Sequence, residues 1–163
     1  MTVTQTKPMN LSHLYVQDFY LWLETTANLL KEGKLAEIDL ENLIEEIESL
    51  GRKEKQSLKS NLMVLLMHLL KYQYQSQKRS NSGKYTIREH RRRLGEALTD
   101  SPSLKGYFLS VFEPCYQEAR KQASDETGLS LDTFPPKSPF SIEETLNPDF
   151  LPDAEDETHN TGE

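Results

Sequence analysis

One histidine, His68, stands where a protein could use it for acid and base chemistry. It lies in the most apolar stretch of the chain, Leu62 to Leu70, and two carboxylates, Glu45 and Glu48, precede it in the same predicted helix. A desolvated imidazole beside carboxylates can exchange a proton near neutral pH. More often, a single histidine in an apolar helix is a core residue whose ring has one hydrogen-bond partner. The sequence supports three functional hypotheses, which are given below, and an enzyme that uses His68, Glu45 and Glu48 ranks third among them.

Metal and nucleophile chemistry have no recognisable motif in this chain. Helical bundles that hold a carboxylate–histidine metal centre commonly carry Glu-x-x-His, and no glutamate stands three residues before His13, His68 or His90. His-Glu-x-x-His, Cys-x-x-Cys, a phosphate loop and a nucleophile elbow do not occur either. The single cysteine, Cys115, is predicted to be a buried free thiol. We expect no metal site and no cofactor.

A basic segment follows the apolar stretch. From Lys71 to Arg93 the sequence holds eight bases and a single acid, Glu89. Bases on a short helix could contact phosphates, and Tyr72, Tyr74 and Tyr85 could stack on nucleobases. Against this hypothesis, the arginines are spread around the predicted helix and the protein as a whole is acidic. The candidate nucleic-acid-binding residues are Lys78, Arg79, Lys84, Arg88, Arg91, Arg92 and Arg93.

An acidic run precedes the apolar stretch. Residues 35–50 contain six acids and no base. On a helical wheel, four of the glutamates share one flank beside the apolar stripe, and we take this flank as the candidate interaction or ion-pair surface: Glu37, Glu41, Glu45 and Glu48. The flank could hold a basic partner or pair with the basic segment of the same chain. The charges could also simply be solvated, since an exposed ion pair contributes only about 0–1 kcal/mol.

The elements that carry these residues are predicted to be helices. Positions 40, 44, 47, 51, 54, 58, 62, 65 and 69 follow one helical stripe, and only Gly51 and Glu54 interrupt its apolar character. Two separate helices would have no reason to share this phase, so we expect one long central helix from about Asp39 to Gln77. Further helices are predicted from Tyr15 or Asp18 to about residue 32, and over 85–98 and 102–127.

The predicted fold class is all-α, a four-helix bundle around the long central helix. Three prolines within 134–140 indicate an extended C-terminal strap, and Ser141 with Glu144 forms a capping-box pattern for one short helix. We expect one helical domain over 14–151, between a flexible N-terminus at 1–13 and a disordered tail at 152–163. That tail carries five acids and no base, so it supplies most of the net charge of -7.

Several of these segments together resemble a known bacterial family, the domain of unknown function 29. The resemblance covers about 14–152, implies an all-helical fold, and brings no agreed activity, cofactor or catalytic residue. This chain has Lys71-Tyr72 where the family often has Lys-Trp, and Ser138 where it has the cysteine of Cys-Pro-Tyr, so no thiol is present at position 138. The matching segments are Asp18-Phe19, Trp22-Leu23, Leu40 to Arg52, His68 to Gln75, Thr86-Ile87-Arg88, Ser101 to Leu104, Glu126 to Leu129 and Pro148 to Pro152.

The sequence as a whole favours a non-catalytic helical module that binds another protein. Nucleic-acid binding through residues 78–93 is the alternative, and an enzyme around His68 comes third. The longest apolar run, Leu62 to Leu70, is too short to span a bilayer, and the N-terminus lacks an apolar signal core, so we expect a cytoplasmic protein without membrane contact. Self-association stays open, because a bundle with aromatic edges could dimerise.

Overall fold

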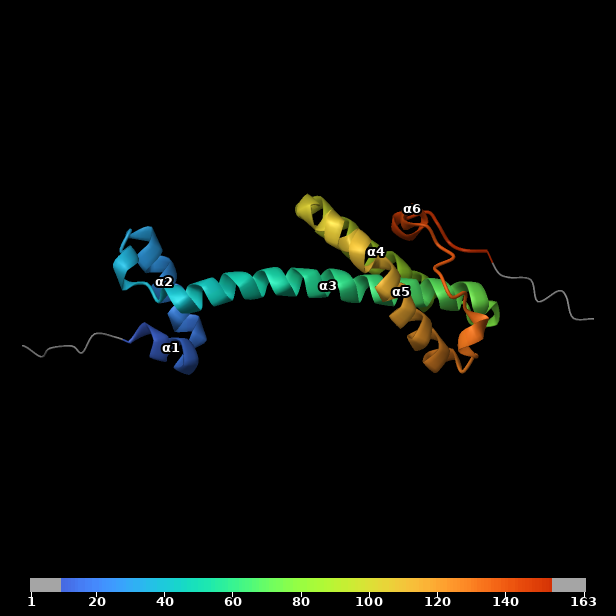
Figure 1. The fold of residues 1–163 in the computed structure, drawn as a ribbon, viewed down its shortest axis with the longest axis horizontal. Helices are drawn as coiled ribbons and strands as arrows, with labels where there is room; N and C mark the ends of the chain where they lie inside the picture. Colours follow the sequence, from blue (N-terminus) through green and yellow to red (C-terminus); the bar gives the residue numbers. More distant parts are fainter. Residues whose placement is uncertain (1–9, 154–163) are drawn as a thin grey trace, which may run out of the picture. The chain divides into compact units, whose positions relative to one another are not determined.

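The structure is a computed structural model that describes residues 10–153; residues 1–9 and most of the predicted acidic tail, 154–163, lie outside the described range. Within that range, every regular element is helical (Figure 1). The α-helices are α1 (Leu11–Gln17), α2 (Phe19–Lys31), α3 (Leu40–Tyr74), α4 (Asn81–Asp100), α5 (Lys105–Thr127) and α6 (Ile142–Leu146). The prediction of an all-helical protein with one long central helix is thus confirmed.

Side-chain caps set several of the helix ends. The Asp18 side chain accepts a hydrogen bond from the Leu21 N–H and starts α2, as predicted. Ser141 and Glu144 form the expected capping box of α6. Helix α4 begins four residues before the predicted position, because Ser80 caps it and residues 81–83 form its first turn. Residues 11–13, which the sequence places in a flexible N-terminus, belong to the additional helix α1.

The chain forms two compact units, which divide between Arg52 and Lys53. Helix α3 passes from the first unit into the second without a break at Gly51, which confirms the prediction of one continuous helix across the glycine (Figure 1). Each unit is described by itself below. The four-helix bundle would need helices of both units packed together, so it stays a prediction.

The second unit contains the hydrophobic core. Helices α4 and α5 pack against the later half of α3, and the most apolar stretch, Leu62 to Leu70, is the most buried part of that helix, as predicted. The fully or almost fully buried core side chains are Leu58, Leu62, Leu65, Leu66, Met67, Leu69, Leu70, Ile87, Leu94, Phe108, Phe112, Cys115, Tyr116, Ala119, Ala123, Phe134 and Phe140. Cys115 is a buried free thiol, and burial raises its pKa, so it is a poor nucleophile.

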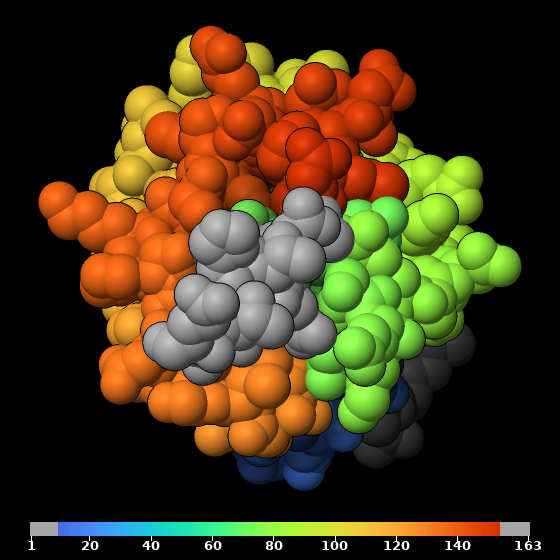
Figure 2. Space-filling view, turned by 90° about the vertical axis from the view of Figure 1, so that its right-hand side faces the viewer, coloured from blue at the N-terminus to red at the C-terminus, as the bar shows by residue number. Residues whose placement is uncertain are grey.

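The C-terminal segment lies against α5 and the end of α3 (Figure 2). Phe134 and Phe140 are part of the core. Polar side chains of α5 satisfy the backbone carbonyls of the proline-rich stretch: Tyr116 Oη donates to Pro135 O, Gln117 Nε2 to Pro136 O, and Arg120 Nε to Phe134 O at 2.9 Å. A stretch that can form no ladder of its own is therefore held by side chains of a neighbouring helix.

Candidate interaction surface and basic cavity

The first unit is organised around a single buried ring, Trp22. Its indole Nε1 donates to Asp39 Oδ2 at 3.3 Å, and the rings of Tyr15 and Phe19 lie 4.9 and 5.9 Å from it. Asp39 also accepts a hydrogen bond from Asn42 Nδ2 at 2.7 Å. The Asp39 carboxylate therefore links Trp22 of α2 to Asn42 in the first turn of α3.

Four aliphatic side chains near the start of α3 form an exposed surface, which we call the apolar face. Leu40, Ile44, Ile47 and Leu50 are 61, 46, 60 and 61 % exposed. Leu40, Ile44 and Ile47 belong to the apolar stripe of α3, which is exposed in this first part and buried in the second unit. Of the fifteen large exposed hydrophobic residues among the described residues, eleven belong to the first unit. Among residues 10–52, Trp22 is the sole hydrophobic residue that is fully buried.

Acidic side chains accompany the apolar face. Glu41, Glu45 and Glu48 lie on α3 and are exposed, whereas Glu37 ends the 3-10 helix Leu35–Glu37 and does not share the α3 wheel, contrary to the prediction. Glu45 forms an ion pair with Arg52. The described residues of the first unit, 10–52, carry nine acids and three bases. The apolar face is thus set in a negative surface.

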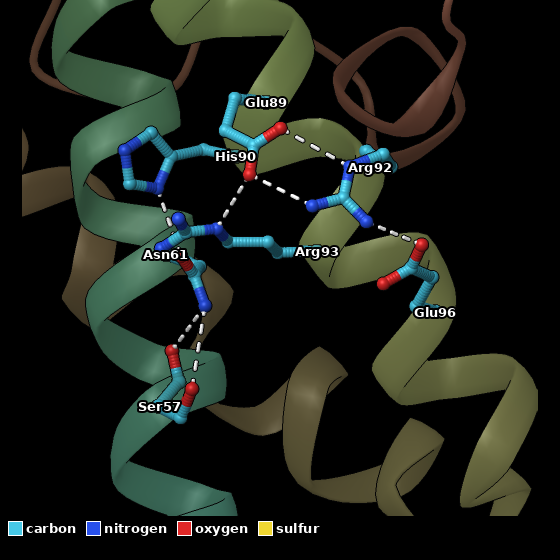
Figure 3. A network of polar contacts seen from close by, with 7 residues as sticks. All are labelled: Ser57, Asn61, Glu89, His90, Arg92, Arg93 and Glu96. Carbon is cyan, nitrogen blue, oxygen red and sulfur yellow. Dashed lines mark hydrogen bonds and ion pairs between the residues drawn. The ribbon is translucent and has the colours of Figure 1, made fainter.

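Ion pairs within α4 neutralise part of the basic segment (Figure 3). Arg92 and Arg93 both donate to Glu89, at 2.8 and 2.9 Å, and Arg92 also pairs with Glu96. Hydrogen bonds from Arg92 and Arg93 lower the pKa of Glu89 to about 2. These two arginines therefore already have carboxylate partners, and the partners are on their own helix.

Another predicted nucleic-acid contact, Arg91, is a structural residue. Its side chain is 4 % exposed and donates three hydrogen bonds to the backbone carbonyls of Thr145, Phe150 and Glu144, at 2.9, 3.0 and 3.4 Å. Burial lowers its pKa. A guanidinium in this position cannot reach a phosphate, so Arg91 leaves the set of candidate nucleic-acid contacts.

His68 has charged neighbours, but they differ from the predicted ones. Burial, and next to it the charge of Lys71, lowers the pKa of His68, while Glu126 of α5 opposes this shift. Glu45 and Glu48 belong to the first unit, roughly six helical turns earlier in α3. The acid–base group that the sequence suggests is therefore not assembled around His68. Among the described residues, no three His, Cys, Asp or Glu side chains are placed to hold a metal ion.

His68 instead lines a cavity of about 190 Å³, which we call the basic cavity. It lies where α3 ends and α4 begins, and the sequence hypotheses did not include it. Its wall combines Lys71 and the two bases of the α3–α4 connection, Lys78 and Arg79. The signal was present in the sequence as two bases directly before Ser80, the N-cap residue of α4.

The stability of the folded protein should depend on pH through the two histidines of the second unit, His68 and His90. His90 Nδ1 lies 2.8 Å from Asn61 Oδ1 (Figure 3), and burial lowers the pKa of both His68 and His90 below the ordinary value of 6.5. In the window below pH 6.5 the unfolded chain then binds more protons than the folded one, so folding becomes less stable as the pH falls. We expect the melting temperature to drop between pH 7 and about 5.5, and the slope to be shallower in His68→Gln. An equal slope in both proteins would contradict this.

No helix among residues 10–153 combines the length and the apolar character that a bilayer crossing requires.

A family model described as "Domain of unknown function DUF29" matches residues 14–151, which is most of the chain. No curated protein and no solved structure matches it.

Proposed function

We propose that this chain, which belongs to the DUF29 family, is a non-catalytic interaction module whose first unit binds a basic protein partner. The observation that carries this proposal is the apolar face: four adjacent aliphatic side chains on α3, each about half exposed or more, beside three glutamates. Large clusters of exposed apolar residues with a polar rim are typical of protein interfaces.

The size of the apolar contribution supports binding rather than simple exposure. Full burial of an exposed leucine or isoleucine side chain contributes about 1.5–3 kcal/mol. Because the four residues are 46–61 % exposed, a partner that covers the apolar face gains roughly twice that amount. Leu40, Ile44 and Ile47 have the i, i+4, i+7 spacing of helical interfaces, and a partner helix packed along this face would present apolar residues at the same spacing.

The charges indicate which partner fits. Glu41 and Glu48 would attract a basic surface and steer its approach, while Glu45 already pairs with Arg52. A second copy that docks by the same face would place this acidic flank opposite itself, because a twofold contact pairs a surface with its own equivalent. Like charges at the rim disfavour that arrangement. The proposed occupant is therefore a basic amphipathic helix of another protein.

The finer features of the fold belong to the same proposal. The hydrogen bonds from Tyr116, Gln117 and Arg120 to residues 134–136 support a strap role for the C-terminal segment. The number and length of the helices support a bundle. We also propose a cytoplasmic location. A basic partner protein and the free thiol of Cys115 are both compatible with that compartment.

Single substitutions on two equally exposed aliphatic residues test it. Ile44 in the first unit and Leu109 in the second are both 46 % exposed. Tagged wild-type protein, Ile44→Asp and Leu109→Asp are purified from the native cell with and without nuclease. We expect a stoichiometric basic protein with the wild type and with Leu109→Asp, at least tenfold less of it with Ile44→Asp, and weaker binding at high salt.

The same experiment separates the alternatives. A partner that Ile44→Asp retains would contradict docking on the apolar face, and a partner without excess basic residues would contradict the charge argument. Material that disappears after nuclease treatment would favour the nucleic-acid alternative. Within residues 10–153, that alternative now rests on the four candidate bases that have no carboxylate partner, Lys78, Arg79, Lys84 and Arg88.

A further inference from the structure

The wall of the basic cavity is cationic in a protein that is acidic overall. Lys71, Lys78, Arg79 and His68 line it together with the hydroxyl residues Ser80 and Ser82, and no described residue in its wall is an aspartate or glutamate. The net charge of the whole chain is -7. Surface bases are usually spread among acids in such a chain, so a cavity with bases alone indicates a place for an anion.

Arg79 is held in place without losing its charge. Its guanidinium stacks on the Tyr72 ring, with Cζ 4.0 Å from the ring centroid. Nε donates to Tyr72 O at 2.9 Å and one terminal nitrogen donates to Pro152 O at 3.4 Å. Both acceptors are neutral carbonyls, and a guanidinium has five N–H donors, so three donors and the full positive charge remain for a ligand.

The other bases of the cavity differ in how far they are compensated. Lys78 makes no ion pair with any residue between 10 and 153. Lys71 pairs with Glu126 at 2.8 Å, and Glu126 is not part of the cavity wall. The cavity is therefore lined by two cations that have no carboxylate partner among residues 10–153, Lys78 and Arg79. A third cation, Lys71, shares its charge with Glu126. One ionised ligand group can enter the space that they line.

The first turn of α4 adds backbone donors to the same wall. The first N–H groups of a helix have no intrahelical partner, and of these the Gly83 N–H is bonded to Ser80 Oγ at 3.0 Å. Ser82 and Gly83 both line the cavity. A helix start by itself would not define a site; here it lies beside Lys78 and Arg79, which supply the charge.

We propose that the basic cavity binds a phosphate monoester group of a small molecule. Arginine recognises phosphate through parallel N–H donors, and lysine binds it as a point charge. A pocket for a drug-sized ligand measures about 300–1,000 Å³, whereas this cavity measures about 190 Å³. It therefore fits a single phosphate with little of the molecule that carries it. This site is in the second unit and is independent of the proposed partner-binding face.

His68 provides a direct readout of an occupied cavity. Burial and Lys71 lower its pKa, Glu126 opposes this shift, and His90 lowers the pKa further. An anion beside the imidazole would stabilise its protonated form. Binding of phosphate should therefore raise the pKa of His68, and NMR can follow the ring protons of His68 with those of His13, in the first unit, as an internal reference.

The test titrates the full-length chain with inorganic phosphate and with glycerol 3-phosphate, against sodium chloride of equal ionic strength. We expect saturable binding with a Kd on the order of 1 mM or below, together with the upward shift of the His68 pKa. Lys78→Gln and Arg79→Gln should each weaken binding about tenfold. Arg88→Gln removes an equal charge from the exposed face of α4, outside the cavity, and should bind as the wild type does.

The variants keep the result decisive. Arg79→Gln loosens the contact with Pro152. The ammonium group of Lys78 makes no hydrogen bond or ion pair with residues 10–153, so Lys78→Gln changes the cavity charge without a structural cost. Tighter binding of glycerol 3-phosphate than of inorganic phosphate would identify the monoester as the ligand class, and the reverse order would assign the site to free phosphate. Binding no stronger than that of chloride, or equal weakening by Arg88→Gln and Lys78→Gln, would overturn the proposal.

Discussion

The Trp22→Ala variant is expected to lose the ordered structure of the first unit while the second unit stays folded. Trp22 is fully buried, and it is the one hydrophobic residue among 10–52 whose side chain is not even partly exposed. Replacing a core tryptophan by alanine costs about 3–5 kcal/mol. The second unit has a core of its own that contains no residue before Leu58, so it does not depend on this ring.

Hydrogen exchange followed by mass spectrometry can measure the two units separately. In Trp22→Ala, amide protection within Phe19–Lys31 should disappear, and protection around Leu62–Leu70 should remain close to that of the wild type. Tyr20→Ala is the matched control, because Tyr20 lies on the same helix and is 74 % exposed, and we expect a change within about 0.5 kcal/mol. Loss of protection in both units at once would show that they fold as one, and would contradict the prediction.

The Trp22→Ala variant also tests the proposed binding of a basic partner protein. The hydrogen bond between Trp22 and Asp39 joins α2 to the start of α3, next to the apolar face. If the first unit binds a basic partner, Trp22→Ala should lose that partner even though the four aliphatic residues of the face are unchanged. The phosphate site of the second unit should be unaffected, which separates the two proposals in a single variant.

Local chemistry explains why the helices could be predicted from the sequence. The caps at Asp18 and Ser141 need only residues three positions away, and the phase of α3 across Gly51 needs only a periodic pattern. The start of α4 was predicted too late for a related reason. A Ser-Asn-Ser-Gly sequence suits both a turn and a capped first helical turn, and the pattern within the segment does not distinguish them.

Burial could not be predicted from the same pattern. Ile44 and Leu65 belong to one stripe of α3, yet the first is about half exposed and the second is fully buried. Periodicity shows that a helix has an apolar face, but not which element covers it. Likewise, the helical wheel puts Glu45 and His68 on one helix without regard to their separation along its axis.

Arg91 shows the same limit for a charged residue. Counting charges placed it with the other bases of 71–93 as a phosphate contact. Its burial depends on carbonyls of residues 144, 145 and 150, which lie more than 50 positions later in the chain. No local pattern connects these segments, so the structural role of Arg91 is visible only in the folded protein.

Replacing Arg91 by methionine should destabilise the second unit by about 2–4 kcal/mol. Methionine keeps most of the aliphatic packing of the arginine stem but removes every donor. The carbonyls of Thr145 and Phe150 then lose the donor of Arg91, whereas Glu144 O keeps the Asn147 N–H at 3.3 Å. A buried acceptor without a partner costs about 1–3 kcal/mol. Part of this loss is offset because the variant no longer has to bury a charge. Urea unfolding measures the difference.

Two further variants show whether the fork of donors is the cause. Arg91→Lys keeps the charge but cannot serve three separate carbonyls with a planar group, so it should lose most of the same stability. Arg88→Met removes an exposed arginine one turn earlier on α4 and should change stability by no more than about 0.5 kcal/mol. Amides within Ile142–Leu146 should exchange faster in Arg91→Met and Arg91→Lys, but not in Arg88→Met. If Arg91→Met proves as stable as Arg88→Met, the three hydrogen bonds do not hold the C-terminal segment, and Arg91 returns to the set of bases that a nucleic acid could contact.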